Sequence, residues 1–404
     1  MRHALTLVGV LALAAACASP GLPPGGPTVS SFPRVIATLP DSNAVNVKPD
    51  KVLLRYDDVI GEQANGGELS RNVLISPWDG EPRVEWRRTG MTIRPRDRWR
   101  TNTAYTITVL PGIGDLRGTP SPFGYVLKFS TGATIPKTVL RGVAFDWAGN
   151  RALPKATVQA IDVRDTTLVY VTVSDSGGRF ELGAMPPGRY LVRAIDERSP
   201  NRQLDAREPW DSATVTIADS ARAELYVFVH DTIPARIAEL RQNDSVTIAI
   251  VMDKPLRPGV PIPATSARVV AADSSAVPVA SVATEAEDRV QRERADSIAR
   301  TADTTARRPA DELGLPRRTI DPTRRRDTVA VVPPAIPTRP PPTTELLIRL
   351  GAPLRAGTTY RVTLTGVRNL LDIEGTSTRL LIIPRAAASD STARPGSPTA
   401  RPPR

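Results

Sequence analysis

The chain has 404 residues, with 40 prolines, 27 glycines and a formal net charge of +11. This length suits about three domains of roughly 150 residues, and the proline and glycine content favours strands joined by turns over long helices. Most basic residues are arginines interleaved with aspartate and glutamate, so the single-sign stripe typical of nucleic-acid-binding proteins is missing. We therefore expect no nucleic-acid partner.

The N-terminus has the pattern of an export signal. A basic start, Met1–His3, precedes an apolar run that ends in small residues at Cys17, the only cysteine of the chain. The run is shorter than the ~20 residues of a membrane-spanning helix and has the length of a signal peptide, which we place at residues 1–17.

This boundary resembles the lipobox of bacterial lipoproteins, in which the chain is cleaved before a cysteine that then carries lipid. Ala14 stands where that family has leucine, and the alternative is an ordinary signal peptide. The resemblance implies lipidation of Cys17 and anchoring in a membrane. Ala18 and Ser19 follow the cysteine in place of aspartate, which in Gram-negative sorting implies the outer membrane. Residues 18–31, rich in proline and glycine, are expected to form an extended tether.

Residues 32–134 are predicted to form a β-sandwich. Seven short segments have the alternation of half-buried strands: 34–38, 51–56, 72–75, 83–87, 91–94, 104–109 and 125–130. Seven short strands are typical of an Ig-like sandwich. The connector Pro40–Val45, the segments Val84–Trp86 and Met91–Pro95, and the end Lys128–Gly132 together resemble the SbsA-type bacterial Ig-like domain, which implies the same fold here.

Residues 137–231 are predicted to form a second, different sandwich. A strand at Val171–Val173 is followed by an Asp-Ser-Gly-Gly turn, which we interpret as a hairpin, and by Phe180 pointing inward. Pro186-Pro187-Gly188 then leads into a strand that carries Tyr190. This order resembles the carboxypeptidase regulatory-like domain, which implies a transthyretin-like sandwich.

Residues 233–385 are predicted to be a weaker copy of the first sandwich. The stretch Trp99–Val109 recurs as Leu354–Leu364, and the tyrosine of each copy, Tyr105 and Tyr360, is placed for a tyrosine corner. Four further segments match strands of the first sandwich: 246–251, 268–271, 277–282 and 345–350. The turns Asp115–Gly118 and Asp372–Gly375 are also expected to correspond, each aspartate bonding its own backbone in preference to holding calcium.

A charged and proline-rich insertion, residues 285–343, interrupts this third sandwich, and its composition gives no core. We expect it to be disordered, with a transiently helical first half, and to leave and re-enter at one hairpin tip. The tail, residues 386–404, has the same composition. The predicted fold class is thus all-β: three tandem β-sandwiches, Ig-like and transthyretin-like, with disordered linkers.

Few residues here are suited to catalysis. Apart from Cys17, the expected mature chain offers a single histidine, His230, so Cys/His zinc sites and nucleophile pairs are not expected. A solvent-facing or capping role suits His230 better than a catalytic one, and we name no catalytic residue, metal site or cofactor. Trp86 and Trp99 are expected in the core of the first sandwich. Trp147 and Trp210 lie in predicted loops of the middle domain and are candidate sugar contacts.

These observations favour a non-enzymatic, lipid-anchored envelope protein with a structural, adhesive or scaffold role, with envelope proteins or polysaccharide as partners. The alternative is a carbohydrate-binding protein that acts through the middle domain. A third possibility, a hydrolase, needs a converging pair of carboxylates.

Overall fold

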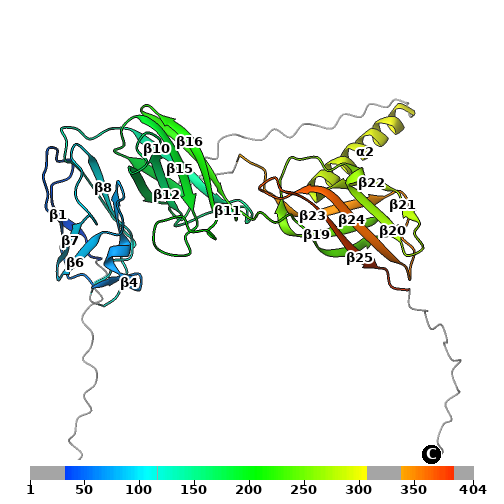
Figure 1. Cartoon of the computed structure of the whole chain (residues 1–404), viewed down its shortest axis with the longest axis horizontal. Coiled ribbons are helices and arrows are strands. Elements are labelled where there is room, and N and C mark those ends of the chain that lie inside the picture. Colours follow the sequence, from blue (N-terminus) through cyan, green and yellow to red (C-terminus); the bar gives the residue numbers. More distant parts are fainter. Residues whose placement is uncertain (1–31, 116, 307–337, 386–404) are drawn as a thin grey trace, which may run out of the picture. The chain divides into compact units, whose positions relative to one another are not determined.

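The structure is a computed structural model and describes residues 32–115, 117–306 and 338–385 (Figure 1). It divides into two compact units, which hold most of residues 32–133 and residues 134–385 respectively. The all-β prediction is confirmed, since the described residues form seven small sheets and a single α-helix. No helix in the described ranges is long and apolar enough to cross a membrane. The signal peptide, the tether and the tail all lie outside the described residues.

The first sandwich has two antiparallel sheets, with strand orders β1-β2-β7-β6 and β5-β8-β9. The strands are β1 (Val35–Leu39), β2 (Val52–Tyr56), β5 (Val73–Ser76), β6 (Arg83–Arg87), β7 (Gly90–Arg94), β8 (Ala104–Val109) and β9 (Tyr125–Ser130). All seven predicted strands are present to within one residue at each end. A small hairpin, β3 (Gln63–Ala64) with β4 (Gly67–Glu68), and a 3₁₀ turn, η1 (Leu69–Asn72), precede β5.

Alternation along the strands builds the core of this sandwich. In β8, Tyr105, Ile107 and Val109 are all buried, while the residues between them are half-buried. The prediction for Trp86 was wrong, because its side chain is 37% exposed. It lies in β6, which is the edge strand of its sheet and turns most of its side chains to solvent. Trp99 is half-buried and packs edge-on against Phe129.

The middle sandwich also has two sheets. One has the order β11-β10-β14, with β17 parallel to β10, and the other has the order β13-β12-β15-β16. The strands are β10 (Val139–Asp146), β11 (Arg151–Ala152), β12 (Thr157–Asp162), β13 (Val169–Val173), β14 (Arg179–Gly183), β15 (Gly188–Ile195), β16 (Trp210–Ile217) and β17 (Ser220–Val227). Because β13 and β14 belong to different sheets, the Asp-Ser-Gly-Gly turn connects the two sheets, and the hairpin interpretation was wrong.

The turn itself and the inward Phe180 are confirmed. The Asp175 carboxylate accepts the backbone N–H groups of Gly177 and Arg179, each at 2.8 Å. Phe180 is 4% exposed, and its ring lies against Gly142, where a Cβ atom would come within 2.3 Å of the ring. Tyr190 is fully buried, and its hydroxyl donates to the Pro186 carbonyl at 2.7 Å. A tyrosine-corner contact, of the kind predicted for Tyr105 and Tyr360, is thus present in the middle sandwich.

The third sandwich repeats the strand order of the first. Its sheets run β18-β19-β23-β22 and β21-β20-β24-β25, matching β1-β2-β7-β6 and β5-β8-β9 with one short strand added. The strands are β18 (Ile237–Asp244), β19 (Thr247–Leu256), β20 (Ala267–Ala271), β21 (Ala276–Val277), β22 (Val279–Ala283), β23 (Thr343–Leu350), β24 (Thr359–Arg368) and β25 (Glu374–Ile382); a 3₁₀ turn, η2 (Ala264–Ser266), precedes β20 as η1 precedes β5. The predicted strand correspondence is confirmed.

One backbone contact is reproduced closely in both copies. In the first sandwich, Arg34 N–H donates to the Asp57 carboxylate at 2.7 Å and Asp57 N–H donates to the Arg34 carbonyl at 3.0 Å. In the third, Arg236 and Asp253 exchange the same two bonds at 2.7 and 2.9 Å. We call this reciprocal pair the Arg–Asp clasp. In each copy the register of the first two strands shifts just after the arginine.

The turn correspondence, in contrast, was wrong by three residues. The Asp115 carboxylate accepts the N–H groups two and four residues ahead, as predicted. In the third sandwich the amide oxygen of Asn369 makes these bonds, to Leu371 and Ile373 at 3.0 and 2.9 Å. Asp372, with a positive φ of 68°, takes the place of Gly118. Aspartate and asparagine can both accept these turn hydrogen bonds and both tolerate a positive φ. The residue types alone therefore do not show which position each of them takes in the turn.

The insertion does leave and re-enter between paired strands, since Ala283 in β22 pairs with Leu347 in β23. Its first part differs from the prediction of disorder: α2 (Glu285–Ala306) is a helix of 22 residues. Thr284 and Glu287 form a reciprocal capping box at its start, with backbone-to-side-chain distances of 2.9 and 3.2 Å. Residues 307–337 of the insertion lie outside the described part of the chain.

Candidate functional site

The middle sandwich carries a continuous row of aromatic rings at one end of β10, β16 and β17. Each ring contacts the next one in the order Trp210, His230, Phe228, Trp147, Tyr226 and Phe145. We call these six residues the aromatic row. It contains both predicted sugar-contact residues, Trp147 and Trp210, and also His230.

Strand geometry explains how the row forms. Tyr226, Phe228 and His230 alternate along the end of β17 and its continuation, and alternate residues of an extended segment share a face. Trp210 begins β16 and pairs with Phe228 through an isolated bridge. Trp147 follows β10 and donates its backbone N–H to the Val227 carbonyl at 3.0 Å.

Stacking is closest around His230. Its ring lies 4.0 Å from Trp210 with an 8° angle between the planes, and 4.3 Å from Phe228 with a 22° angle. Burial lowers the pKa of His230 below its usual value. The expected solvent-facing or capping role is therefore replaced by a half-buried imidazole that links two aromatic rings.

Both tryptophans already have cationic neighbours. The Arg193 guanidinium carbon is 5.7 Å from the Trp210 ring centroid, and that of Arg339 is 5.9 Å from Trp147. The Trp147 indole N–H donates to the Pro340 carbonyl at 3.1 Å. A sugar stacking on Trp147 would compete with these groups, and sugar contact at either tryptophan stays a prediction.

Two carboxylates near the aromatic row accept hydrogen bonds from backbone N–H groups. Asp211 is half-buried and accepts the Tyr226 N–H at 2.7 Å, and its partial burial raises its pKa. Glu208, 4% exposed, accepts the N–H groups of Arg198, Ser199 and Asp205, which together lower its pKa despite burial. Both carboxylates therefore have a structural role, because they accept backbone N–H groups of the middle sandwich.

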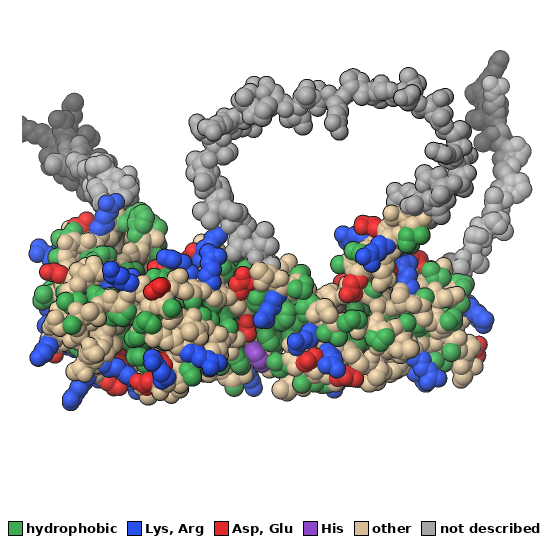
Figure 2. Space-filling model, turned by 90° about the horizontal axis from the view of Figure 1, so that it is seen from above, with side chains coloured by type: hydrophobic (Ala, Val, Ile, Leu, Met, Phe, Trp, Pro, Cys, Tyr) green, Lys and Arg blue, Asp and Glu red, His purple; other side chains and the backbone are tan. Residues whose placement is uncertain are grey.

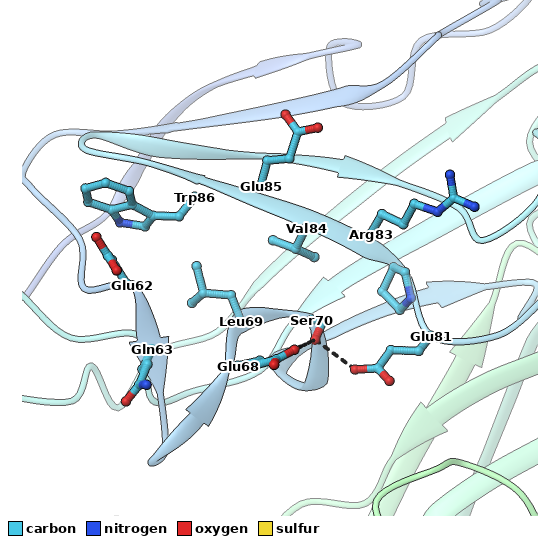
Figure 3. Close-up of a pocket in the computed structure, with 11 residues that line it drawn as sticks. Glu62, Gln63, Glu68, Leu69, Ser70, Glu81, Arg83, Val84, Glu85 and Trp86 are labelled. Atoms are coloured by element: carbon cyan, nitrogen blue, oxygen red, sulfur yellow. Dashed lines mark hydrogen bonds between the residues drawn. The ribbon is translucent and has the colours of Figure 1, made fainter.

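The first sandwich has a hollow of about 550 Å³ between η1 and β6 (Figure 3). Its lining includes four carboxylates: Glu62, Glu68, Glu81 and Glu85. Ser70 donates to Glu81 at 2.8 Å, and the Trp86 indole N–H donates to the Ile60 carbonyl at 2.9 Å. A hydrogen bond from Thr92, with Arg94 nearby, lowers the pKa of Glu85. Arg83 and the apolar side chains of Leu69 and Val84 also line the hollow, so its lining is mixed.

Neither the aromatic row nor the hollow of the first sandwich has side chains grouped as metal ligands. Within the described ranges, no group of three or more His, Cys, Asp or Glu side chains could hold a metal ion. Figure 2 shows arginine and lysine mixed with aspartate and glutamate over the visible face of the described domains. Cys17, the predicted lipidation site, lies outside the described residues.

A family match agrees with the fold of the first sandwich. Residues 30–131 match the family model of the bacterial Ig-like domain. The first sandwich is therefore an Ig-like domain, and the third sandwich repeats its strand order and its Arg–Asp clasp. No comparison tests the likeness of the middle sandwich to the carboxypeptidase regulatory-like domain, which stays a prediction.

Solved structures give weaker likenesses. The L,D-transpeptidase from Mycobacterium smegmatis is 14% identical, with 49% of this chain and 77% of that chain covered and a TM-score of 0.18. The N-terminal part of the bacterial S-layer protein SbsC is 15% identical, with 47% and 44% covered and a TM-score of 0.20. The major pilin subunit of Bacillus cereus is 10% identical, with 47% and 70% covered and a TM-score of 0.18. No functional conclusion follows at such scores, and no curated protein matches the sequence.

Proposed function

We propose that this chain is a lipid-anchored protein of the bacterial cell envelope with a structural, adhesive or scaffold role. The observation that carries the proposal is the repetition of the Ig-like strand order, β1-β2-β7-β6, as β18-β19-β23-β22. A row of sandwiches in which one kind recurs suits a protein that spaces or displays its parts, because each sandwich supplies its own core.

The sequence supports the anchor. Cys17 is the only cysteine and directly follows an apolar run of signal-peptide length, and a proline- and glycine-rich segment separates it from the first Ig-like domain. Ala18 and Ser19 after the cysteine favour the outer membrane of a Gram-negative bacterium. In this proposal the chain is not an enzyme and works through protein or polysaccharide partners of the envelope.

Fractionation of cells tests the anchor. In cells that make the wild-type chain, we expect the protein in the outer-membrane fraction. Cys17→Ser should leave the protein uncleaved or soluble, while the matched variant Ser19→Ala should fractionate as the wild type does. If Cys17→Ser stays in the outer-membrane fraction with unchanged mass, the lipid anchor is disproved.

The second candidate function is carbohydrate binding by the middle sandwich. The observation in its favour is that Trp147 and Trp210 belong to one aromatic row. Binding to isolated envelope polysaccharide should then fall in Trp147→Ala and Trp210→Ala, and should not fall in Trp78→Ala, a half-buried tryptophan outside the row. Equal binding by all three variants would remove this function.

A further inference from the structure

A short segment of the chain lies on the aromatic row. Thr338, Arg339 and Pro340 come just before β23 of the third sandwich. Each of the three contacts the middle sandwich through a different group: a hydroxyl, a guanidinium and a carbonyl. Three consecutive residues of the segment are thus engaged, and they share the partners Glu224, Tyr226 and Trp147.

The Tyr226 hydroxyl is the centre of this contact. It accepts the backbone N–H groups of Thr338 and Arg339 at 2.8 and 3.0 Å, and it donates to the Glu224 carboxylate at 2.7 Å. A phenol hydroxyl can both donate and accept, so Glu224 orients it with its lone pairs toward the segment. Tyr226 is 1% exposed because Phe145, Trp147 and Arg339 pack against its ring, on the face of β17 opposite to the core residues Leu225 and Val227.

Two further contacts select the side chains. The Thr338 hydroxyl donates to the same Glu224 oxygen at 2.6 Å, and this bond is the main reason why the pKa of Glu224 lies below its usual value. The Arg339 guanidinium carbon lies 4.8 Å from the Tyr226 ring centroid, within the range of a cation–π interaction. Glu224 therefore pairs with the threonine, and the rings pair with the arginine.

The flanking prolines fit an extended ligand. Pro340 offers its carbonyl to Trp147 and has no N–H to leave unsatisfied. Prolines 341 and 342 directly follow the motif and favour an extended polyproline conformation before docking, which reduces the entropy lost on binding. Aromatic surfaces are a recurring partner of such proline-flanked peptides.

We propose that Glu224, Tyr226 and Trp147 form a docking site for an extended Thr-Arg-Pro peptide, and that residues 338–340 occupy it in cis. The site thereby attaches the C-terminal end of the insertion to the middle sandwich. When the cis segment is withdrawn, the site takes a second peptide of the same sequence. This inference does not depend on the lipid anchor.

Hydrogen exchange on the full chain tests the cis contact. Prolines 337, 340, 341 and 342 carry no amide, so exchange in this stretch reports almost only on Thr338 and Arg339. Both amides should be protected in the wild type, and Tyr226→Phe should raise their exchange about tenfold or more, because their shared acceptor is lost. Tyr190→Phe, which also removes one buried hydroxyl of the middle sandwich, should leave them protected. Unprotected wild-type amides, or equal exchange in both variants, would overturn the proposal.

Binding in trans tests the recognition itself. The probe is a fluorescein-labelled peptide with the sequence of residues 335–342, added to the full chain. It should bind the vacated variant Thr338→Ala/Arg339→Ala about tenfold more tightly than the wild type, whose site is occupied. Adding Trp147→Ala to the vacated variant should abolish binding. If the vacated variant binds the peptide no better than the wild type does, the site does not recognise the motif.

Discussion

Asp288, in the first turn of α2, accepts two hydrogen bonds from the guanidinium of Arg349 in β23, at 2.8 and 3.0 Å. The Asp288 side chain is only 4% exposed. Arg292, one turn further along α2, forms an ion pair with the same carboxylate at 3.0 Å. Through this contact the start of the insertion packs on the third sandwich, although its composition suggested that the insertion contributes nothing to the core.

Asp288→Ala should therefore destabilise the third sandwich. Arg349 would lose a bidentate partner while remaining partly buried, at a cost of about 1–3 kcal/mol. Urea unfolding of the full chain, followed by a probe of the third sandwich, measures this cost. Glu285→Ala is the matched control, because its ion pair with Arg289 is solvent-exposed on both sides and should change stability little. Equal effects of the two variants would show that the Asp288 contact is not structural.

The same pair predicts how the helix responds to acid. The hydrogen bonds from Arg349 hold the pKa of Asp288 below its usual value of 3.8. A carboxylate whose pKa is lowered by folding stabilises the fold above its unfolded-state pKa, and this contribution is lost as the pH falls through the folded-state pKa. Hydrogen exchange of α2 amides should thus stay slow until the pH falls below 3.8. In Asp288→Asn this acid-induced loss should be absent; an identical pH profile would contradict it.

Tyr360 closes the tyrosine corner of the third sandwich. Its ring is 1% exposed, and its hydroxyl accepts the Arg355 N–H at 2.7 Å. Tyr360→Ala should cost about 3–5 kcal/mol as a large-to-small core substitution. Tyr360→Phe should cost only about 1 kcal/mol, because it removes the hydrogen bond and keeps the ring. Tyr105, 3% exposed at the same position of β8, should show the same ratio. Denaturant melts that tolerate Ala and Phe equally at Tyr360 would disprove the corner.

Asn369 is predicted to be the most sensitive turn residue. It is 3% exposed, its oxygen accepts two backbone N–H groups, and its amide nitrogen donates to the carbonyls of Asp231 and Ile233. Asn369→Ala should cost about 1–3 kcal/mol, since several buried partners lose their bonds together. Asp115→Ala removes the equivalent turn bonds in a more exposed setting and should cost less. Thermal melts compare the two; a larger loss for Asp115→Ala would contradict the role assigned to Asn369.

Local signals in the sequence were sufficient for much of the fold. Alternating β-branched residues placed the seven strands of the first sandwich, and the recurrence of the stretch around Tyr105 at Tyr360 revealed the repeated architecture. A further local signal, the capping box Thr284–Glu287, would have predicted α2. The burial of Asp288 was not predictable, because its partner Arg349 is 61 residues away in the chain.

The candidate site was only partly predictable. Trp147 and Trp210 were found as loop tryptophans, and the alternation of Tyr226, Phe228 and His230 would have indicated their shared face. The contact between this face and Arg339 was not predictable. Tyr226 and Arg339 are 113 positions apart, and no local sequence pattern indicates such a contact. The prediction that Asp372 is equivalent to Asp115 failed for a similar reason. Only the hydrogen bonds of the folded chain show that Asn369, three residues earlier, accepts the turn N–H groups.

The N-terminus of the mature protein tests the proposed envelope role most directly. Mass spectrometry of the protein purified from membranes, without any tag ahead of residue 18, should find Cys17 as the first residue and a mass increase from attached acyl chains. Alkaline hydrolysis should reduce this mass by releasing ester-linked acyl chains. A first residue other than Cys17, or an unmodified Cys17, would contradict the proposal that this chain is a lipid-anchored protein of the cell envelope.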